Sequence, residues 1–241
     1  MPDYVLGPET RGRLMQASTA SIATALFKRG FRSQMIQGSL PVARKPCNMV
    51  GQAFTLRYMP AREDRNPISV FRNEDHPQRV AIERCPPGHV LVIDSRKDAR
   101  AASAGSILVA RLEVRGCAGV VTDGGFRDAE AIGALDMPAY HVRPSAPTNL
   151  TLHEAIDINV PIGCGDAPVF PGDVIVGDGD GVIVVPAHLA DEIAEECAGM
   201  EEFEAFVRES VREGHSIIGL YPPTREETLK RYEVWRAGRT P

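Results

Sequence analysis

The sequence predicts an α/β fold built on a mixed sheet, followed by a C-terminal helical extension. Two observations carry this prediction. Short apolar runs, HVLVID at 89–94 and AGVV at 118–121, alternate with segments of helical spacing, an order typical of parallel strands joined by helices. In the later part of the chain, alternating runs flank the Gly/Asp turn at 177–181, which indicates an antiparallel hairpin in the same sheet.

The first half of the chain is expected to contribute helices and strands in turn. Residues 8–29 predict a helical region with helical spacing of apolar residues over 22–29, and candidate caps stand at Ser18, Thr19 and Ser21. Residues 51–58 alternate and predict a strand with Phe54 and Leu56 on the same face. The remaining elements expected in this half are a loop at 31–50, an exposed charged insertion at 60–77, a short helix ending at Arg84, a strand at 89–94 and a helix at 105–115.

The second half is expected to end in helices after a β-rich segment. Trp235, the single tryptophan, lies in the last predicted helix, so the tail needs an apolar partner. A neighbouring subunit and the chain's own domain both remain open as that partner. The elements expected here are strands at 118–121, 137–142 and 153–163, a helix at 128–135, a hairpin at 171–186, a long helix at 187–209 and a last helix at 226–237.

Composition limits the class of protein. With 241 residues and 43% apolar content, one sizeable core plus an appendage is expected, and we place the boundary between a domain at 1–186 and an extension at 187–241. A formal net charge of −5 argues against a nucleic-acid partner. No run approaches the roughly 18 apolar residues of a membrane span, and the start lacks a basic leader with an apolar core. We therefore expect a cytoplasmic protein with no membrane association.

Cysteine and histidine spacing does not indicate a zinc or disulfide scaffold. The five cysteines are scattered without a C-x-x-C pair, and no two of the six histidines stand four residues apart on one helix. A zinc site is therefore not expected.

The central stretch at 117–132, CAGVVTDGGFRDAEAI, carries the strongest functional signal. Its apolar run ends at Asp123, where glycines follow, and Arg127 and Asp128 then precede the next helix. Ligands of α/β proteins bind at such carboxyl ends of strands. Two interpretations remain open from spacing alone. Asp128 either caps its helix, or it binds a hard divalent cation while Arg127 holds an anionic oxygen.

Two other positions offer weaker signals. Gly105 and Ser106 stand at a helix start, where free backbone N–H groups suit a carboxylate or phosphate, although Ser106 could equally be a simple cap. Asp178 and Asp180 could be metal ligands, but turn formation is the favoured role because Asp and Gly suit a tight hairpin.

Three segments together resemble the RraA-like family, which contains regulators of ribonuclease activity A and 4-hydroxy-4-methyl-2-oxoglutarate aldolases. They are GVVTDGGFRD, AGSILVARLEVRG and PGDVIVGDGDGVIVVP, and the similarity runs over about 18–196. The resemblance implies an RraA-like, swivelling-type α/β domain that assembles as trimers or hexamers with active sites between subunits. It does not cover the C-terminal extension.

The resemblance also implies a chemistry. Catalytic members are divalent-metal-dependent lyases that cleave a C–C bond of a small 2-oxo acid to give pyruvate enolate, as in aldol cleavage or oxaloacetate decarboxylation. Arg127 would be the catalytic residue that holds the pyruvyl oxygen, and Asp128 would bind Mg²⁺, Mn²⁺ or another divalent cation, partly through waters. The implied substrate-binding set is Gly105, Ser106, Ile107, Leu108 and Arg127, with the backbone amides of 106–108 on the substrate carboxylate.

This chain departs from the aldolase pattern at two positions. Aldolase members often carry an acid where Ser106 stands and another where Ala131 stands. A decarboxylase, or a sugar-acid lyase or dehydratase, therefore stays open beside the aldolase. A regulator of ribonuclease that binds protein without catalysis and an inactive structural oligomer are the alternatives outside the enzymes.

Overall fold

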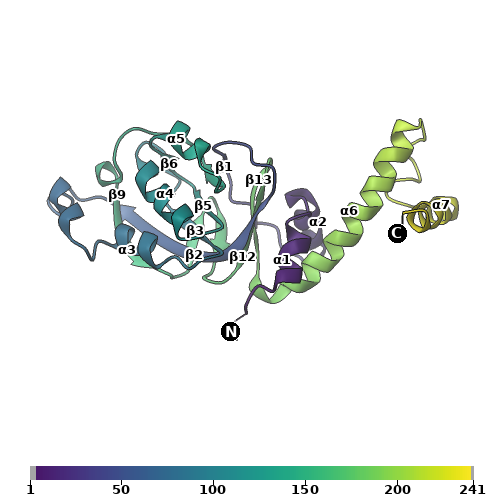
Figure 1. Ribbon diagram of the computed structural model, residues 1–241, viewed down its shortest axis with the longest axis horizontal. Helices are drawn as coiled ribbons and strands as arrows, with labels where there is room; N and C mark the ends of the chain where they lie inside the picture. The colour runs from purple at the N-terminus through teal and green to yellow at the C-terminus, as the bar shows by residue number, and fades with distance from the viewer. Residues whose placement is uncertain (1–3, 240–241) are drawn as a thin grey trace.

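The computed structural model describes residues 4–239. A mixed sheet of eight strands lies at the centre of the molecule (Figure 1). Four neighbouring strands run parallel and the others join antiparallel, so the predicted mixed sheet is confirmed. The strand order is β1 (Leu40–Pro41), β7 (Ala139–His141), β5 (Gly119–Thr122), β3 (His89–Asp94), β2 (Met49–Pro60), β12 (Val174–Asp178) and β13 (Gly181–Val185), with β9 (His153–Ile158) paired to the far part of β2.

Helices cover the sheet in two groups. One face carries α3 (Pro77–Arg84), α4 (Ser106–Val114) and α5 (Ala129–Ala134), as Figure 1 shows. On this face Phe54 and Leu56 of β2 are buried beneath the helices, so the predicted alternation of that strand is confirmed. A second group, α1 (Pro8–Leu14), α2 (Thr19–Lys28) and the start of α6 (Ala190–Arg212), packs on the β12–β13 hairpin.

The helical region predicted over 8–29 is confirmed, and the chain forms α1 and α2 there with a break between them. Ser18 has extended backbone angles (φ −74°, ψ 149°), and its hydroxyl accepts a hydrogen bond from the Ser21 amide at 3.1 Å. A serine in this conformation satisfies the first free amides of a new helix better than it continues an old one. Ser18, one of the residues predicted as caps, is therefore the N-cap of α2.

The loop predicted at 31–50 contains more structure than expected. It holds β1, the start of β2 and a bridge between Met35 and Ile183. The charged insertion is mostly exposed, as predicted, and contains one short 3₁₀ helix, η1 (Ile68–Arg72). The predicted hairpin at the Gly/Asp turn is confirmed as β12 and β13. At that turn Asp178 accepts hydrogen bonds from the Asp180 and Thr19 amides, so it joins the hairpin to the start of α2.

Two small sheets extend the domain. A parallel sheet of β4 (Ala102–Ala104), β6 (Gly125–Phe126) and β8 (Arg143–Pro144) lies at the carboxyl ends of the main strands. The hairpin of β10 (Ile162–Cys164) and β11 (Ala167–Val169) packs on the other face of the main sheet. In the first of these sheets β4 pairs with β6, so the segment that precedes α4 lies beside the segment that precedes Arg127 and Asp128.

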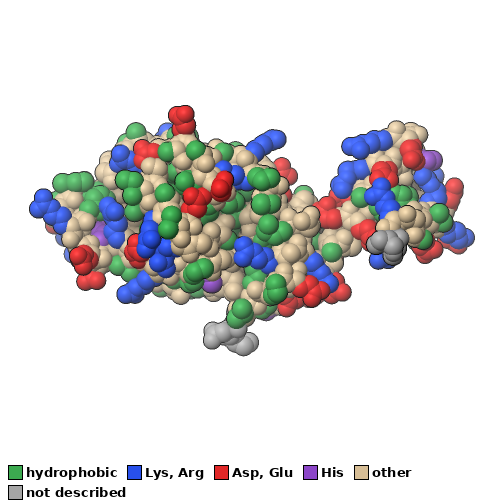
Figure 2. All heavy atoms as spheres, viewed as in Figure 1, with side chains coloured by type: hydrophobic (Ala, Val, Ile, Leu, Met, Phe, Trp, Pro, Cys, Tyr) green, Lys and Arg blue, Asp and Glu red, His purple; other side chains and the backbone are tan. Residues whose placement is uncertain are grey.

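The C-terminal extension forms a helical arm. After the 3₁₀ turn η3 (Ala187–Leu189), α6 begins on the domain, where Ile193 and Cys197 pack against α1 and α2. The far half of α6 carries Phe206. Trp235 of α7 (Glu226–Ala237) packs edge-on against it, with 5.8 Å between the two ring centroids. Figure 1 and Figure 2 show this end standing away from the body, with charged side chains over its surface. The tail thus docks on its own α6, and both the boundary at 186/187 and a subunit contact by the arm stay predictions.

Within residues 4–239, none of the helices combines the length and apolar character that crossing a bilayer requires. All five cysteines are free.

Candidate active site

Arg127 and Asp128 face the start of α4. The Ser106 hydroxyl donates to Asp128 Oδ2 at 3.1 Å, and the Ser106 amide approaches the same oxygen at 3.4 Å. Arg127 Nε lies 3.7 Å from that oxygen. Two segments about twenty residues apart in sequence, both singled out by their pattern, therefore form one cluster of opposite charges beside a helix N-terminus.

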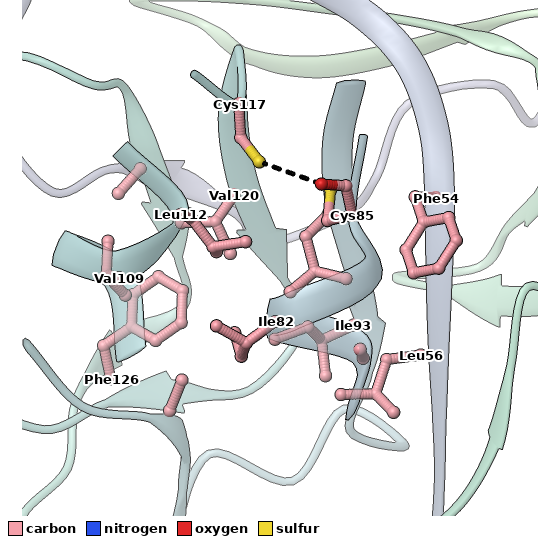
Figure 3. Packing of buried hydrophobic residues seen from close by; sticks show 14 of the residues in the cluster. Phe54, Leu56, Ile82, Cys85, Ile93, Val109, Leu112, Cys117, Val120 and Phe126 are labelled. Atoms are coloured by element: carbon pink, nitrogen blue, oxygen red, sulfur yellow. Dashed lines mark hydrogen bonds between the residues drawn. The ribbon is translucent and has the colours of Figure 1, made fainter. Parts of the chain in front are cut away.

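Phe126 fixes the position of this cluster. Its ring is fully buried beneath Val109 and Leu112 of α4, as Figure 3 shows. The next residue is tied down as well, since the Arg127 amide donates to the Ala104 carbonyl at 3.1 Å. The aromatic residue before the Arg-Asp pair is thus the anchor that sets the pair against the helix.

Gly105 is required by close approach. A Cβ atom at this position would lie 2.8 Å from Cγ of Arg127 and 3.2 Å from Oδ2 of Asp128. The backbone of Gly105 is extended (φ −123°), so any residue could adopt its conformation. The glycine is therefore needed for the contact with the Arg-Asp pair and not for a turn.

The capping interpretation of Asp128 is wrong. Its side chain makes no capping hydrogen bond to α5, and its backbone is left-handed (φ 58°, ψ 39°). A non-glycine residue in this region is uncommon and is found at functional sites, although Asp tolerates it better than most. The alternative role of Ser106 as a cap is wrong too, because Gly105 holds the N-cap position of α4 and the hydroxyl turns to Asp128.

The three amides expected to hold a carboxylate differ in their hydrogen bonds. The Leu108 amide donates to the Gly105 carbonyl at 3.1 Å, and the Ser106 amide points at Asp128. Ile107 is the second residue of the helix, where an amide has no intrahelical acceptor. The Ile107 amide is thus the most available donor for a ligand.

A cavity of about 240 Å³ opens over this cluster. Ser106 contacts Asp128 but does not line the cavity. The other sequence-predicted site residues do line it. The sequence analysis missed the rest of the lining, whose residues lack a recognisable motif. Its complete lining is Phe71, Gln78, Arg79, Ala102, Ala104, Gly105, Ile107, Leu108, Arg127, Asp128, Thr148 and Asn149.

The donor set suits a hydrated hard cation. Residues 4–239 hold no group of three or more His, Cys, Asp or Glu side chains able to enclose a metal ion. Asp128, whose side chain is 45% exposed, is the one carboxylate among the described residues that line the cavity. Mg²⁺ usually retains several waters and binds through one or two carboxylates plus substrate oxygens. These residues therefore fit magnesium and do not fit a tetrahedral zinc site.

The first half of the same motif takes part in a buried polar cluster. Asp123 is 1% exposed and accepts backbone hydrogen bonds from Ser95 at 2.6 Å and from Lys97 and Gly165 at 3.1 Å each. Burial raises the pKa of Asp123, and these three donors oppose the rise. Asp94 at the end of β3 is partly buried, and desolvation raises its pKa to about 6. These carboxylates brace the loops that support the site.

Comparisons with known proteins bear on the family of the chain. A family model described as RraA-like, Aldolase/RraA, matches residues 19–184. A relative from Halalkalibacterium halodurans, with the provisional name 4-hydroxy-4-methyl-2-oxoglutarate aldolase, is 38% identical over 117 residues, which are 47% of this chain and 53% of the relative. The matching part thus spans about half the length of that relative.

Solved structures give the same result for the fold. Streptomyces coelicolor RraAS2, described as an unusual member of the RNase ES inhibitor RraA protein family, has a TM-score of 0.74 at 28% identity, over 84% of this chain and 97% of that one. An uncharacterized protein from Pseudomonas syringae pv. tomato has a TM-score of 0.75 at 23% identity, over 88% and 96% of the two chains, and this likeness shows the fold alone.

Proposed function

The chain belongs to the RraA-like family, and from this premise we propose that it is a divalent-metal-dependent lyase that cleaves a C–C bond of a 2-oxo acid to give pyruvate enolate. One observation carries the proposal. Arg127, Asp128 and the amide-bearing start of α4 line one cavity, held there by the close contact at Gly105. This arrangement offers an anion-binding helix end, a guanidinium and a carboxylate to a single small ligand.

Each group has a distinct role in the proposed reaction. The helix amides, led by Ile107, would hold the C1 carboxylate of the substrate. Arg127 would donate to the 2-oxo oxygen and stabilise the negative charge that grows there as the bond breaks. Asp128 would hold Mg²⁺ or another divalent cation, which when bound supplies Lewis-acid polarisation of the 2-oxo acid.

The available acids favour decarboxylation over aldol cleavage as the minimal reaction. Aldol cleavage needs a base to remove the C4 hydroxyl proton, whereas loss of CO₂ from C3 needs only the electron sink before C3 is protonated. Ser106 and Ala131 stand where aldolases often carry acids, and the described cavity lining holds no carboxylate besides Asp128. Aldol cleavage by this site therefore requires a base from a neighbouring subunit.

The test is pyruvate release from oxaloacetate and from 4-hydroxy-4-methyl-2-oxoglutarate, with Mg²⁺ and then with EDTA. Reactions without protein measure the decarboxylation that metal ions cause alone. We expect EDTA-sensitive turnover of oxaloacetate above that background. Metal-independent turnover would contradict the proposal that Asp128 binds a catalytic metal. Absence of turnover on both substrates would contradict this reaction.

A second candidate function is regulation of a ribonuclease through protein binding, without catalysis. It is favoured by the likeness to RraAS2, whose description names the RNase ES inhibitor family. The fold can serve either role. Inhibition of a ribonuclease that persists in the Asp128→Asn variant, together with no lyase turnover by the wild type, would favour this candidate.

We also propose that the chain is a cytoplasmic homo-oligomer, a trimer or hexamer, with the arm as a subunit contact. The arm exposes apolar side chains, among them Ile217 at 50%, Ile218 at 72% and Val234 at 74%. Such side chains favour association. Removal of residues after Gly214 should lower the mass measured by light scattering, and an unchanged number of subunits would contradict the role of the arm.

A further inference from the structure

Two buried thiols meet at the edge of the main sheet that lies away from the candidate active site. Cys85 directly follows α3, and Cys117 lies two residues before β5, so both stand near the amino ends of the parallel strands β3 and β5. The Cys117 thiol donates to the Cys85 carbonyl at 3.7 Å, drawn as the dashed line in Figure 3. The two thiol groups also share a hydrogen bond. Nothing in the proposed reaction uses this pair.

The pair is distinct among the five cysteines. Cys164 is as fully buried as Cys85, but its thiol donates to a backbone carbonyl of β3 at 3.6 Å. Cys197 is buried where α6 packs on α1 and α2, and Cys47 is exposed. Within residues 4–239, Cys85 and Cys117 are the one pair of cysteines with a hydrogen bond between their side chains. Since single thiols fill the other buried positions, packing does not explain why two stand in contact here.

Cys117 is the more accessible member of the pair. Cys117 is 8% exposed, whereas Cys85 is fully buried. Its neighbour Gly116 is exposed and Ala118 is half-buried, so Cys117 lies just below the surface. Local opening of such a segment costs less free energy than unfolding of the whole domain. A small oxidant therefore reaches Cys117 first.

The two thiols also differ in how readily they ionise. The hydrogen bond from Cys85 lowers the pKa of Cys117, and the positive charge of Arg115 lowers it further, whereas burial opposes both. The same hydrogen bond raises the pKa of Cys85. Arg115 is held beside the pair, because its Nη2 donates to the Cys85 carbonyl at 3.4 Å. A thiol that ionises first beside one that stays protonated suits a nucleophile with a resolving partner.

We propose that Cys85 and Cys117 form a redox-active dithiol that a hydroperoxide converts into an intramolecular disulfide. The Cys117 thiolate attacks an oxygen of hydrogen peroxide, so the O–O bond breaks, Cys117 becomes a sulfenic acid and the other oxygen leaves as water. The Cys85 sulfur then attacks the Cys117 sulfur, and the sulfenic oxygen leaves with the Cys85 proton as a second water. Two electrons pass from the dithiol to the peroxide. This chemistry does not depend on the proposed lyase reaction.

The disulfide would join the end of α3 to the segment before β5. The first turn of α3 carries Gln78 and Arg79, which line the cavity, so the bond would fix the far end of a helix that borders the site. It would also close the loop at 85–117, which restricts the unfolded chain. The oxidised chain should therefore unfold at a higher urea concentration than the reduced chain, and a thiol reductant should reverse the difference.

Peroxide treatment of the folded Cys47→Ala variant tests the proposal. This variant retains four of the five cysteines and lacks the exposed thiol that would join two chains. Titration of the thiols in urea should show two of the four lost after treatment, with a mass lower by two hydrogens, and digestion should give one peptide pair linked through Cys85 and Cys117. Dithiothreitol should restore all four. Retention of four thiols, or a disulfide between other cysteines, would overturn the proposal.

Single variants in the same background test the order of the two steps. Cys85→Ala should leave the sulfenic acid on Cys117 unresolved, so dimedone should add once to that residue, whereas Cys117→Ala should leave Cys85 unmodified. Cys164→Ala is the matched control, because it removes an equally buried thiol without a thiol partner and should still form the disulfide.

Two results would overturn the assignment of a redox-active pair even where the variants fold, as urea unfolding establishes. The first is absence of a dimedone adduct on Cys117 in the Cys85→Ala variant. The second is a urea midpoint of the oxidised chain that is no higher than that of the reduced chain, since the thiols in contact would then not be positioned to accept the bond.

Discussion

Asp123 and Asp128 stand five residues apart in one motif, yet the fold uses them in opposite ways. Asp123 is 1% exposed and accepts hydrogen bonds from three backbone amides. Asp128 has a side chain 45% exposed, and its hydrogen bonds come from Ser106 alone. The first carboxylate has its acceptors occupied by the chain, whereas the second keeps lone pairs for a ligand.

The difference shows that two acids of one motif can have different roles, which their burial distinguishes. A buried carboxylate is retained only where donors compensate for its desolvation, so its role is to order the loops that supply those donors. An exposed carboxylate held in a strained backbone conformation gains nothing for folding from that strain. The same residue type therefore orders loops at Asp123 and keeps exposed oxygen acceptors at Asp128.

The largest effect should come from Asp128→Asn. Asparagine keeps the shape and tolerates the left-handed backbone, but it removes the charge that would hold a divalent cation. We expect turnover to fall by about a thousandfold, or ~4 kcal/mol, with the free energy of unfolding changed by less than about 0.5 kcal/mol. Steady-state kinetics and urea unfolding measure the two quantities. Undiminished turnover would contradict the metal assignment.

The identical substitution at Asp123 should do the reverse. An asparagine side chain in its place would direct an N–H group against the amides of Ser95, Lys97 or Gly165, leaving buried donors unsatisfied. We expect the free energy of unfolding to fall by about 2–4 kcal/mol, seen as a lower urea midpoint at unchanged slope. If Asp123→Asn leaves the midpoint unchanged, the two aspartates do not differ as the geometry indicates.

Gly105→Ala is expected to have a smaller effect on the same pair. The added methyl group would meet Cγ of Arg127 at 2.8 Å and must displace that side chain. We expect about a tenfold loss of kcat/KM, or ~1.4 kcal/mol, because a displaced guanidinium no longer stabilises the developing charge. Gly199→Ala in α6 is the control, since a Cβ there meets no atom within 4 Å. Equal activity in both variants would show that the close contact is dispensable.

Local pattern was enough to predict most elements and one half of the site. The strand at 89–94, the β12–β13 hairpin and the start of α4 follow from periodicity and turn residues that act over a few positions. Arg127 and Asp128 were singled out because they follow the glycine break after the strand at 118–121 and precede a helix. The alternation of β2 was predictable because it is a periodicity of a few positions.

The other half of the site depends on packing between distant segments. Phe71, Arg79 and Asn149 meet across about eighty residues, and none belongs to a pattern that a short window can detect. The sequence offered Ser18, Thr19 and Ser21 as caps, and the choice of Ser18 depends on its extended backbone, which the pattern does not specify. The conformation of Asp128 depends on its contacts with α4, which its neighbours in sequence do not specify.

A third carboxylate, Asp94, lies between the two extremes and should give the smallest effect. It is partly buried, and its Oδ1 accepts one backbone hydrogen bond, from Arg96 at 2.8 Å. Because burial raises its pKa to about 6, the folded state binds more protons than the unfolded state between about pH 4 and pH 6. Stability contributed by this group is therefore lost as the pH rises through that window.

Asp94→Asn should remove this loss, since the amide keeps the Oδ1 acceptor and cannot ionise. Above pH 6 the variant should be more stable than the wild type by about 1 kcal/mol, and below about pH 4 the two should coincide. Asp98→Asn is the control of opposite sign, because Arg100 lowers the pKa of Asp98 to about 2. That variant should be the less stable one above pH 4. A difference for Asp94→Asn that does not change with pH would contradict the raised pKa of Asp94.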